Sequence, residues 1–337
     1  MTGRERVYRT LACDHPDRVP RQLWTLPAAA MEHGQETLKR FRARFPSDFA
    51  GAAGAAKVCL TRGNAYEVGT FTDEWGCTFI NVQRGIIGEV KEPLVEDWSR
   101  LELVRPPEAL LNIDVAEANR SIAATDGFVI AGCCPRPFER LQFLRGSENV
   151  YLDLAEEPPE FFDLLQRVHG YYLKELEVWS RTGVDCLTFM DDWGSQRSLL
   201  ISPAQWRRVF KPLYQQYCDL AHAAGKKIFM HSDGYIADIY EDLIEIGVDA
   251  VNSQLFIMDI EEIGRRYAGQ ITFWGEIDRQ HLLSHGTPEQ CRQAVQRVAA
   301  NLMRGGGGVI AQFEYGGTTR PENAEAVFEE WNRISTR

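Results

Sequence analysis

The sequence predicts a (β/α)8 barrel, and three observations support this fold class. Eight short runs rich in β-branched and aromatic residues recur along the chain, and in the second half they alternate with amphipathic helical stretches. The helical stretches end in glycine and lead into apolar runs, which is typical of parallel βα units. A length of 337 residues suits one such barrel. We therefore expect a single domain over residues 1–337.

The expected strands follow the chain in order. The first three are residues 18–24 (RVPRQLW), 47–51 (SDFAG) and 126–134 (DGFVIAGCC). The other five are residues 183–192, 226–233, 248–254, 270–278 and 307–315. Before the third strand, about residues 68–95 combine alternating apolar residues with glycines, which predicts an inserted antiparallel hairpin.

The helix expected over residues 202–227 begins at a plausible N-cap, Ser202, with Pro203 at its first position. Its apolar residues recur at spacings of three and four, which predicts a stripe that packs on a sheet: Trp206, Val209, Phe210, Leu213, Tyr217 and Leu220. Further helices are predicted over residues 236–247, 259–269 and 287–305.

An open doubly wound sheet is the alternative fold. No G-x-G-x-x-G motif follows a strand, which excludes the usual dinucleotide-binding version of that fold. The run RGGGGVI precedes a strand instead of opening a helix, so we interpret it as a turn.

Composition and charge argue against several classes of protein. The formal net charge is -11 and no long basic run occurs, which argues against a nucleic-acid binder. No segment approaches the roughly 20 apolar residues of a membrane span. Eight cysteines in a chain of this length do not indicate a disulfide framework. We expect a cytoplasmic protein that acts on a small molecule.

Polar residues follow the apolar part of most predicted strands. In a barrel, the carboxyl ends of the strands converge on one mouth, where such enzymes hold their chemistry. The strand ends from the third to the eighth supply, in order, Cys133, Cys134, Arg136 and Arg140; Asp191, Asp192, Trp193, Gln196 and Arg197; His231 and Asp233; Asn252, Ser253 and Gln254; Trp274, Glu276, Asp278 and Arg279; and Gln312, Glu314 and Tyr315.

A metal site is one interpretation of these strand ends. His231 and Asp233 are two residues apart on an extended strand, so they point the same way. Glu276 and Glu314 would complete the site from neighbouring strands. Imidazole and carboxylate ligands suit a divalent ion, with zinc, manganese or iron as candidates. Alternatively, Asp233 orients His231 as a metal-free catalytic histidine.

Structural roles compete with the functional ones. An aspartate after a strand often caps the next helix, which applies to Asp278 and to one of Asp191 and Asp192. Trp193 and Trp274 are either packing surfaces or walls of a substrate pocket.

Several stretches resemble the uroporphyrinogen decarboxylase superfamily, especially its corrinoid-dependent methyltransferase branch. They include FERLQFLRGSENVYLDLAEEP, GVDCLTFMDDWGSQRSLLISPAQWRRVFKPLY, HAAGKKIFMHSDG, DLIEIGVDAVNSQ, ITFWGEID and TRPENAEAVFEEW. The likeness covers residue 120 to the C-terminus and extends loosely to DRVP near residue 17. It implies the same barrel.

The resemblance implies two competing activities. The decarboxylases carry R-Q-A-G-R-Y, whereas Arg21 and Gln22 are followed here by Leu23 and Trp24. The methyltransferases hold zinc with H-x-C and a later cysteine. His231 matches the histidine, Asp233 replaces the first cysteine, and Phe313-Glu314 lie near the second.

We therefore hypothesise a methyl or other one-carbon transferase that works with a separate corrinoid protein or a thiol. Zinc would bind His231, Asp233, Glu276 and Glu314, while Asp191 and Asp192 position the substrate. The expected substrate-binding residues are Trp193, Gln196, Arg197, Asn252, Gln254, Trp274, Arg136 and Tyr315. The resemblance also allows a homodimer.

Two alternatives remain open. The first is a decarboxylase or lyase in which Arg136, Arg140 or Arg197 holds a carboxylated substrate and a carboxyl group beside His231 donates a proton. The second is a non-catalytic module that binds a corrinoid or tetrapyrrole. The chain is not a corrinoid carrier itself, because D-x-H-x-x-G does not occur.

Overall fold

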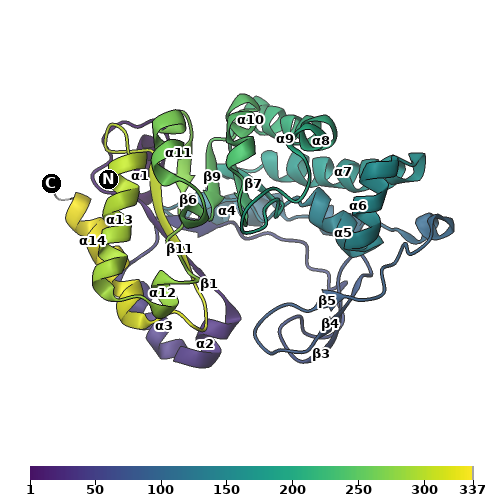
Figure 1. Ribbon diagram of the computed structural model, residues 1–337, viewed down its shortest axis with the longest axis horizontal. Coiled ribbons are helices and arrows are strands. Elements are labelled where there is room, and N and C mark those ends of the chain that lie inside the picture. The colour runs from purple at the N-terminus through teal and green to yellow at the C-terminus, as the bar shows by residue number, and fades with distance from the viewer. Residues whose placement is uncertain (336–337) are drawn as a thin grey trace.

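The computed structural model describes residues 1–335 and contains eight parallel strands in a nearly closed barrel (Figure 1). The order around the barrel is β1, β11, β10, β9, β8, β7, β6 and β2. The strands are β1 (Arg21–Thr25), β2 (Phe49–Gly51), β6 (Phe128–Ile130), β7 (Cys186–Met190), β8 (Lys227–Ser232), β9 (Ala250–Ser253), β10 (Thr272–Trp274) and β11 (Val309–Tyr315). Each overlaps its predicted range, and the predicted (β/α)8 barrel is confirmed.

Helices cover the outside of the barrel. In Figure 1, α13 and α14 lie side by side near both chain ends, while α7, α8 and α9 lie on the opposite side. The α-helices are α1 (Gly3–Leu11), α2 (Pro27–His33), α3 (Gln35–Arg44), α4 (Val115–Ala123), α5 (Pro137–Arg145), α6 (Ser147–Glu156), α7 (Pro159–Ser180), α8 (Pro203–Val209), α9 (Lys211–Ala223), α10 (Tyr240–Glu245), α11 (Ile260–Tyr267), α12 (Leu282–His285), α13 (Pro288–Leu302) and α14 (Pro321–Ser335). Short 3-10 helices are η1 (Trp98–Leu103), η2 (Glu108–Leu111), η3 (Ala237–Ile239) and η4 (Leu255–Ile257).

The helix predicted over residues 202–227 is two helices, α8 and α9. Ser202 caps α8 as expected, because its side chain accepts a hydrogen bond from the backbone N–H of Gln205. The break falls at Phe210, just before Pro212. Proline lacks an N–H and its ring clashes with the carbonyl four residues earlier, so a continuous helix ends there. The predicted apolar stripe survives the break, since Trp206 and Tyr217 are both fully buried.

The barrel interior is filled by alternate strand residues. Phe128, Phe229 and Ile310 are fully buried in one cluster with Val7 of α1. Helix α1 thus closes the end of the barrel where the strands begin, and its Arg4 Nε donates to Asp185 at 2.9 Å. The opposite end, where the strands finish, is left for the mouth.

A second sheet lies between β2 and β6 in the sequence. It has three antiparallel strands, β3 (Gly69–Thr72), β4 (Thr78–Asn81) and β5 (Glu89–Val90), where the sequence predicted a two-stranded hairpin. Figure 1 shows it below α5 and α6, across from α2 and α3. The loop after β4 nevertheless reaches α2, because a Cβ built on Gly85 would lie 3.0 Å from the Cβ of Ala28.

None of the helices within residues 1–335 has both the length and the apolar character that a membrane span requires.

Candidate active site at the barrel mouth

The imidazole of His231 is held in a defined orientation at the mouth by a hydrogen bond. It lies on β8 opposite Asn252 of β9, and its Nδ1 is 2.7 Å from the Oδ1 of Asn252. The amide nitrogen of Asn252 donates to the backbone oxygen of Trp274 and, at 2.9 Å, to Oε1 of Gln312. Because the amide nitrogen is occupied, Oδ1 must accept from His231, which fixes the proton on Nδ1. In the neutral imidazole, the lone pair is therefore on Nε2.

Two carboxylates face this Nε2 atom. Its distances are 3.6 Å to Oδ1 of Asp192 and 3.8 Å to Oδ1 of Asp233. Both exceed hydrogen-bond length. Asp192 Oδ1 also accepts from the backbone N–H of Asp233 at 2.9 Å, which ties the ends of β7 and β8 together. Oδ1 of Asp233 is buried and lacks a hydrogen-bond partner among residues 1–335.

These three residues fit a divalent ion. One ligand atom from each lies within 4.8 Å of the others, and no further group of this kind occurs in the described part of the chain. An imidazole nitrogen with two carboxylate oxygens suits zinc or a similar ion. A cation among them would also satisfy the orphaned Asp233 oxygen, which otherwise costs about 1–3 kcal/mol.

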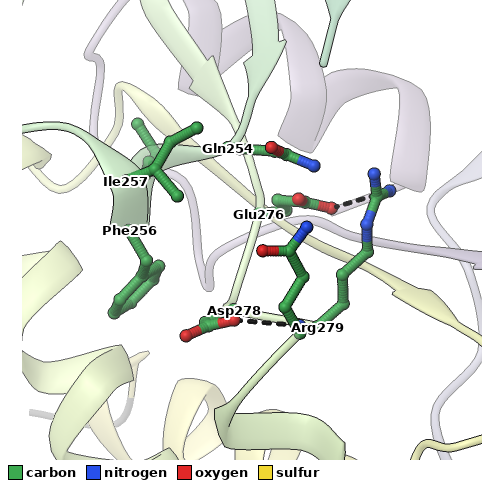
Figure 2. Close-up of a pocket in the computed structure, with 8 residues that line it drawn as sticks. Gln254, Phe256, Ile257, Glu276, Asp278 and Arg279 are labelled. Atoms are coloured by element: carbon green, nitrogen blue, oxygen red, sulfur yellow. Dashed lines mark hydrogen bonds and ion pairs between the residues drawn. The ribbon is translucent and has the colours of Figure 1, made fainter. Parts of the chain in front are cut away.

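Arg279 gathers the other acidic residues of the mouth. Its guanidinium binds Oδ2 of Asp233, lies 3.1 Å from Oε1 of Glu314, and lies 3.6 Å from Oε2 of Glu276. Figure 2 shows Glu276 directed at this guanidinium, beside Gln254. Glu276 and Glu314, predicted as metal ligands, thus surround an arginine. Of the predicted ligand set, only His231 and Asp233 belong to the group that could hold a metal ion.

Burial at the mouth shifts the pKa values of Glu276 and Glu314. Burial, together with the nearby charges of Asp233 and Glu314, raises the pKa of Glu276 to about 8, although Arg279 opposes the rise. Burial also raises the pKa of Glu314, again against Arg279. Glu276 is only 4% exposed, and its raised pKa favours the protonated form at neutral pH.

Asp191, predicted to position the substrate, has a structural place instead. It is fully buried and accepts hydrogen bonds from the backbone N–H groups of Phe138 and Glu139 at 2.9 and 2.7 Å. The hydroxyl of Tyr214 donates to it at 2.6 Å. It therefore caps the first turn of α5.

Trp193 and Tyr315 point away from the mouth, although both were predicted to bind substrate. Trp193 is fully buried, stacks on Phe138 at 4.1 Å, and donates through Nε1 to Tyr214. Tyr315 is also fully buried, with its ring against Phe41 of α3. Successive residues of a strand face opposite sides of the sheet, so Tyr315 on β11 faces the helices. Trp193 lies beyond the end of β7 and packs against α5.

A cavity of about 570 Å³ occupies the mouth. His231, Glu314 and Trp274 line it, as do Trp24 and Gln22 of β1. Trp24 lies edge-on to both His231 and Trp274, at 5.2 and 5.1 Å between ring centroids. Trp274 Nε1 donates to Oε1 of Gln22 at 2.7 Å, which holds the indole in place.

The remaining predicted substrate-binding residues are dispersed. Gln196 and Arg197 are exposed on the loop after β7. Gln254 is buried and accepts from the backbone N–H of Gly234 at 3.2 Å. Arg136 lines a different cavity.

Trp24 and Gln22 were not predicted as site residues. The rule applied above to the later strands would also have found them. Both are polar or aromatic residues near the carboxyl end of β1, at alternate positions that face the barrel interior. Trp24 packs against the cluster inside the barrel, as expected for a residue at such a position.

The chain is thus a parallel (β/α)8 barrel that carries an imidazole and two carboxylates at its mouth. The sequence matches the uroporphyrinogen decarboxylase (URO-D) family over residues 70–334, and the chain belongs to this family.

Among solved structures, a methyltransferase from Methanosarcina mazei is similar over 99% of both chains, with a TM-score of 0.70 and 15% sequence identity. A 3-keto-D-glucoside 4-epimerase from E. coli matches 66% of this chain and 84% of its own, with a TM-score of 0.39 and 13% identity. At 15% identity, the likeness to the methyltransferase concerns the fold alone. No curated protein matches the sequence at a significant level.

Proposed function

We propose that this URO-D-family protein is an enzyme that transfers a methyl group at the barrel mouth, with a divalent metal held by Asp192, His231 and Asp233. The observation that carries the proposal is that Nε2 of His231 faces two carboxylates. One of them, Asp233, has a buried oxygen without a hydrogen-bond partner among residues 1–335. A divalent ion bound there would favour the deprotonated form of an acceptor thiol.

The chain's own residues supply the rest. Asn252 holds the imidazole in the orientation that a ligand needs. Arg279 binds the second oxygen of Asp233 and so limits how far this carboxylate can turn. Trp24 and Trp274 form an apolar wall beside His231, suited to a methyl group and its carrier.

The donor in this proposal is a methylated corrinoid, brought by a separate protein. In the transfer, the bond between cobalt and carbon breaks, cobalt keeps the electron pair, and a bond between carbon and sulfur forms. The thiol proton is released to solvent.

Decarboxylation has weaker support from the geometry. That reaction needs a guanidinium that is available for a substrate carboxylate. Arg279 at the mouth already faces three carboxyl groups, and Arg136 and Arg140 are paired with acidic residues in another cavity. Arg197 lies exposed on the loop after β7. The protonated Glu276 is the one feature that suits a proton-donating lyase.

Methyl transfer is tested with methylcobalamin and a panel of small thiols, with the protein first loaded with Zn²⁺. We expect demethylation of the corrinoid, seen in its absorbance spectrum, and a loss of at least about 100-fold in His231→Ala. Failure of the loaded protein with every thiol, or full activity in the variant, would overturn the proposal.

A further inference from the structure

A second cavity, of about 500 Å³, lies outside the barrel mouth. Its walls come from the turn between β3 and β4, the first turns of α5, and the middle of α7. Cys134 lines both this cavity and the one at the mouth, so the two adjoin there. Its lining includes Trp75, Arg136, Arg140, Phe143, Tyr171 and Glu175.

Aromatic rings give this cavity an apolar body. The guanidinium carbon of Arg140 lies 5.1 Å from the ring centroid of Trp75 and 5.4 Å from that of Phe143. Tyr171 meets Trp75 edge-on at 5.1 Å. These rings hold Arg140 in place and leave an apolar surface for a ligand.

Most charges around the cavity are matched within the protein. Arg136 donates to Glu139 at 2.9 Å. Arg140 binds Asp73, through one guanidinium nitrogen, and Glu74 at 3.1 Å through another. Arg140 and Asp73 are each only 5% exposed, so the ion pair between them is shielded from solvent.

Two atoms of opposite charge remain unmatched. Nε of Arg140 and Oε2 of Glu175 are both buried, and neither has a hydrogen-bond partner among the described residues. An unsatisfied buried polar atom costs about 1–3 kcal/mol, more if it is charged. Burial raises the pKa of Glu175 to about 7 despite the nearby Arg136 and Arg140, so a cation beside it would restore its charge.

We propose that this second cavity binds a small zwitterion of the amino-acid class. Its ammonium group would donate to Oε2 of Glu175, its carboxylate would accept from Nε of Arg140, and its apolar part would lie against the aromatic rings. A ligand with only one charge leaves one of the two atoms unmatched. The inference goes beyond the proposed methyl transfer and uses none of the residues that would hold the metal.

Calorimetric titration of the full-length protein with each of the twenty common L-amino acids tests this. The tightest binder is then compared with the amine that lacks its carboxylate and the acid that lacks its ammonium. We expect the amino acid to bind at least about tenfold more tightly than either analogue. Absence of binding by all twenty, or equal binding of one analogue, would overturn the proposal.

Variants locate the ligand. Glu175→Gln keeps the shape of the side chain and removes its charge, so binding should weaken about ten- to a hundredfold. Glu177→Gln, on the same helix but exposed and paired with Arg181, is the matched control and should bind as the wild type does.

His231→Ala separates this inference from the proposed function. It should bind the amino acid with unchanged affinity, whatever its effect on methyl transfer. Unchanged binding by Glu175→Gln, or loss of binding by His231→Ala, would place the ligand elsewhere and contradict the inference.

Discussion

At the scale of single residues, Glu276 is the carboxyl group whose burial has the clearest consequence. Its pKa is raised to about 8 in the folded protein, against about 4.3 for an exposed glutamate. A raised pKa means that folding favours the protonated form. The stability from this group is fully present below about pH 4.3 and is lost as the pH rises through about 8.

Glu276→Gln should therefore change the pH dependence of stability. We expect the variant to gain stability relative to the wild type as the pH rises from 5 to 9, by up to about 1.4 kcal/mol per pH unit in the steepest part. Urea unfolding at pH 5, 7 and 9 measures this. Parallel stability profiles for the two proteins would show that Glu276 titrates normally.

Asn252 makes a separate prediction, because it orients His231 without being a metal ligand. Asn252→Leu removes the acceptor for Nδ1 and lets the imidazole rotate. We expect the affinity for Zn²⁺ to fall about 10- to 100-fold while the protein stays folded. Competition with a chromogenic chelator measures the affinity, and circular dichroism checks the fold. An unchanged affinity would remove Asn252 from the site.

At the scale of elements, the alternation of side chains along each strand decides which residues reach the mouth. On β7 and its extension, Thr188, Met190 and Asp192 face inward, whereas Asp191 and Trp193 face the helices. On β11, Glu314 faces the cavity and Tyr315 faces α3. Adjacent residues at a strand end therefore have different roles.

Substitutions of the neighbouring residues Asp191 and Asp192 test this alternation. Asp191→Ala leaves two backbone N–H groups of α5 and the Tyr214 hydroxyl without their acceptor, so we expect a loss of about 2–4 kcal/mol of stability. Asp192→Ala, at a partly exposed residue, should cost less than about 1 kcal/mol but weaken metal binding. Chemical denaturation and metal titration of both variants distinguish the roles, and the reverse pattern would contradict them.

At the scale of the whole molecule, the barrel was predictable because most of its strands are short apolar runs bounded by polar and glycine residues. His231 and Asp233 were predictable for the same reason, since a spacing of two on a strand places them on one side. The break of the 202–227 helix was also readable, because Pro212 stands inside the apolar pattern.

The rest of the site depends on loop geometry that local patterns do not encode. Arg279 contacts Asp233 although 46 positions separate them in the sequence, and the same guanidinium lies beside Glu314 and Glu276. Asp192 joins His231 through the backbone N–H of Asp233, a contact 41 positions apart. Composition and periodicity carry no information about such pairings.

Metal content measured by mass spectrometry is the most direct test of the mouth as a metal site. We expect about one zinc or similar divalent ion per chain in the wild type after loading and desalting, and little in His231→Ala. His222→Ala is the matched control, because His222 also meets a carboxylate, Asp249 at 3.0 Å, but lies away from the mouth. Wild-type protein without bound metal after loading, or equal metal in His231→Ala and His222→Ala, would contradict the assignment.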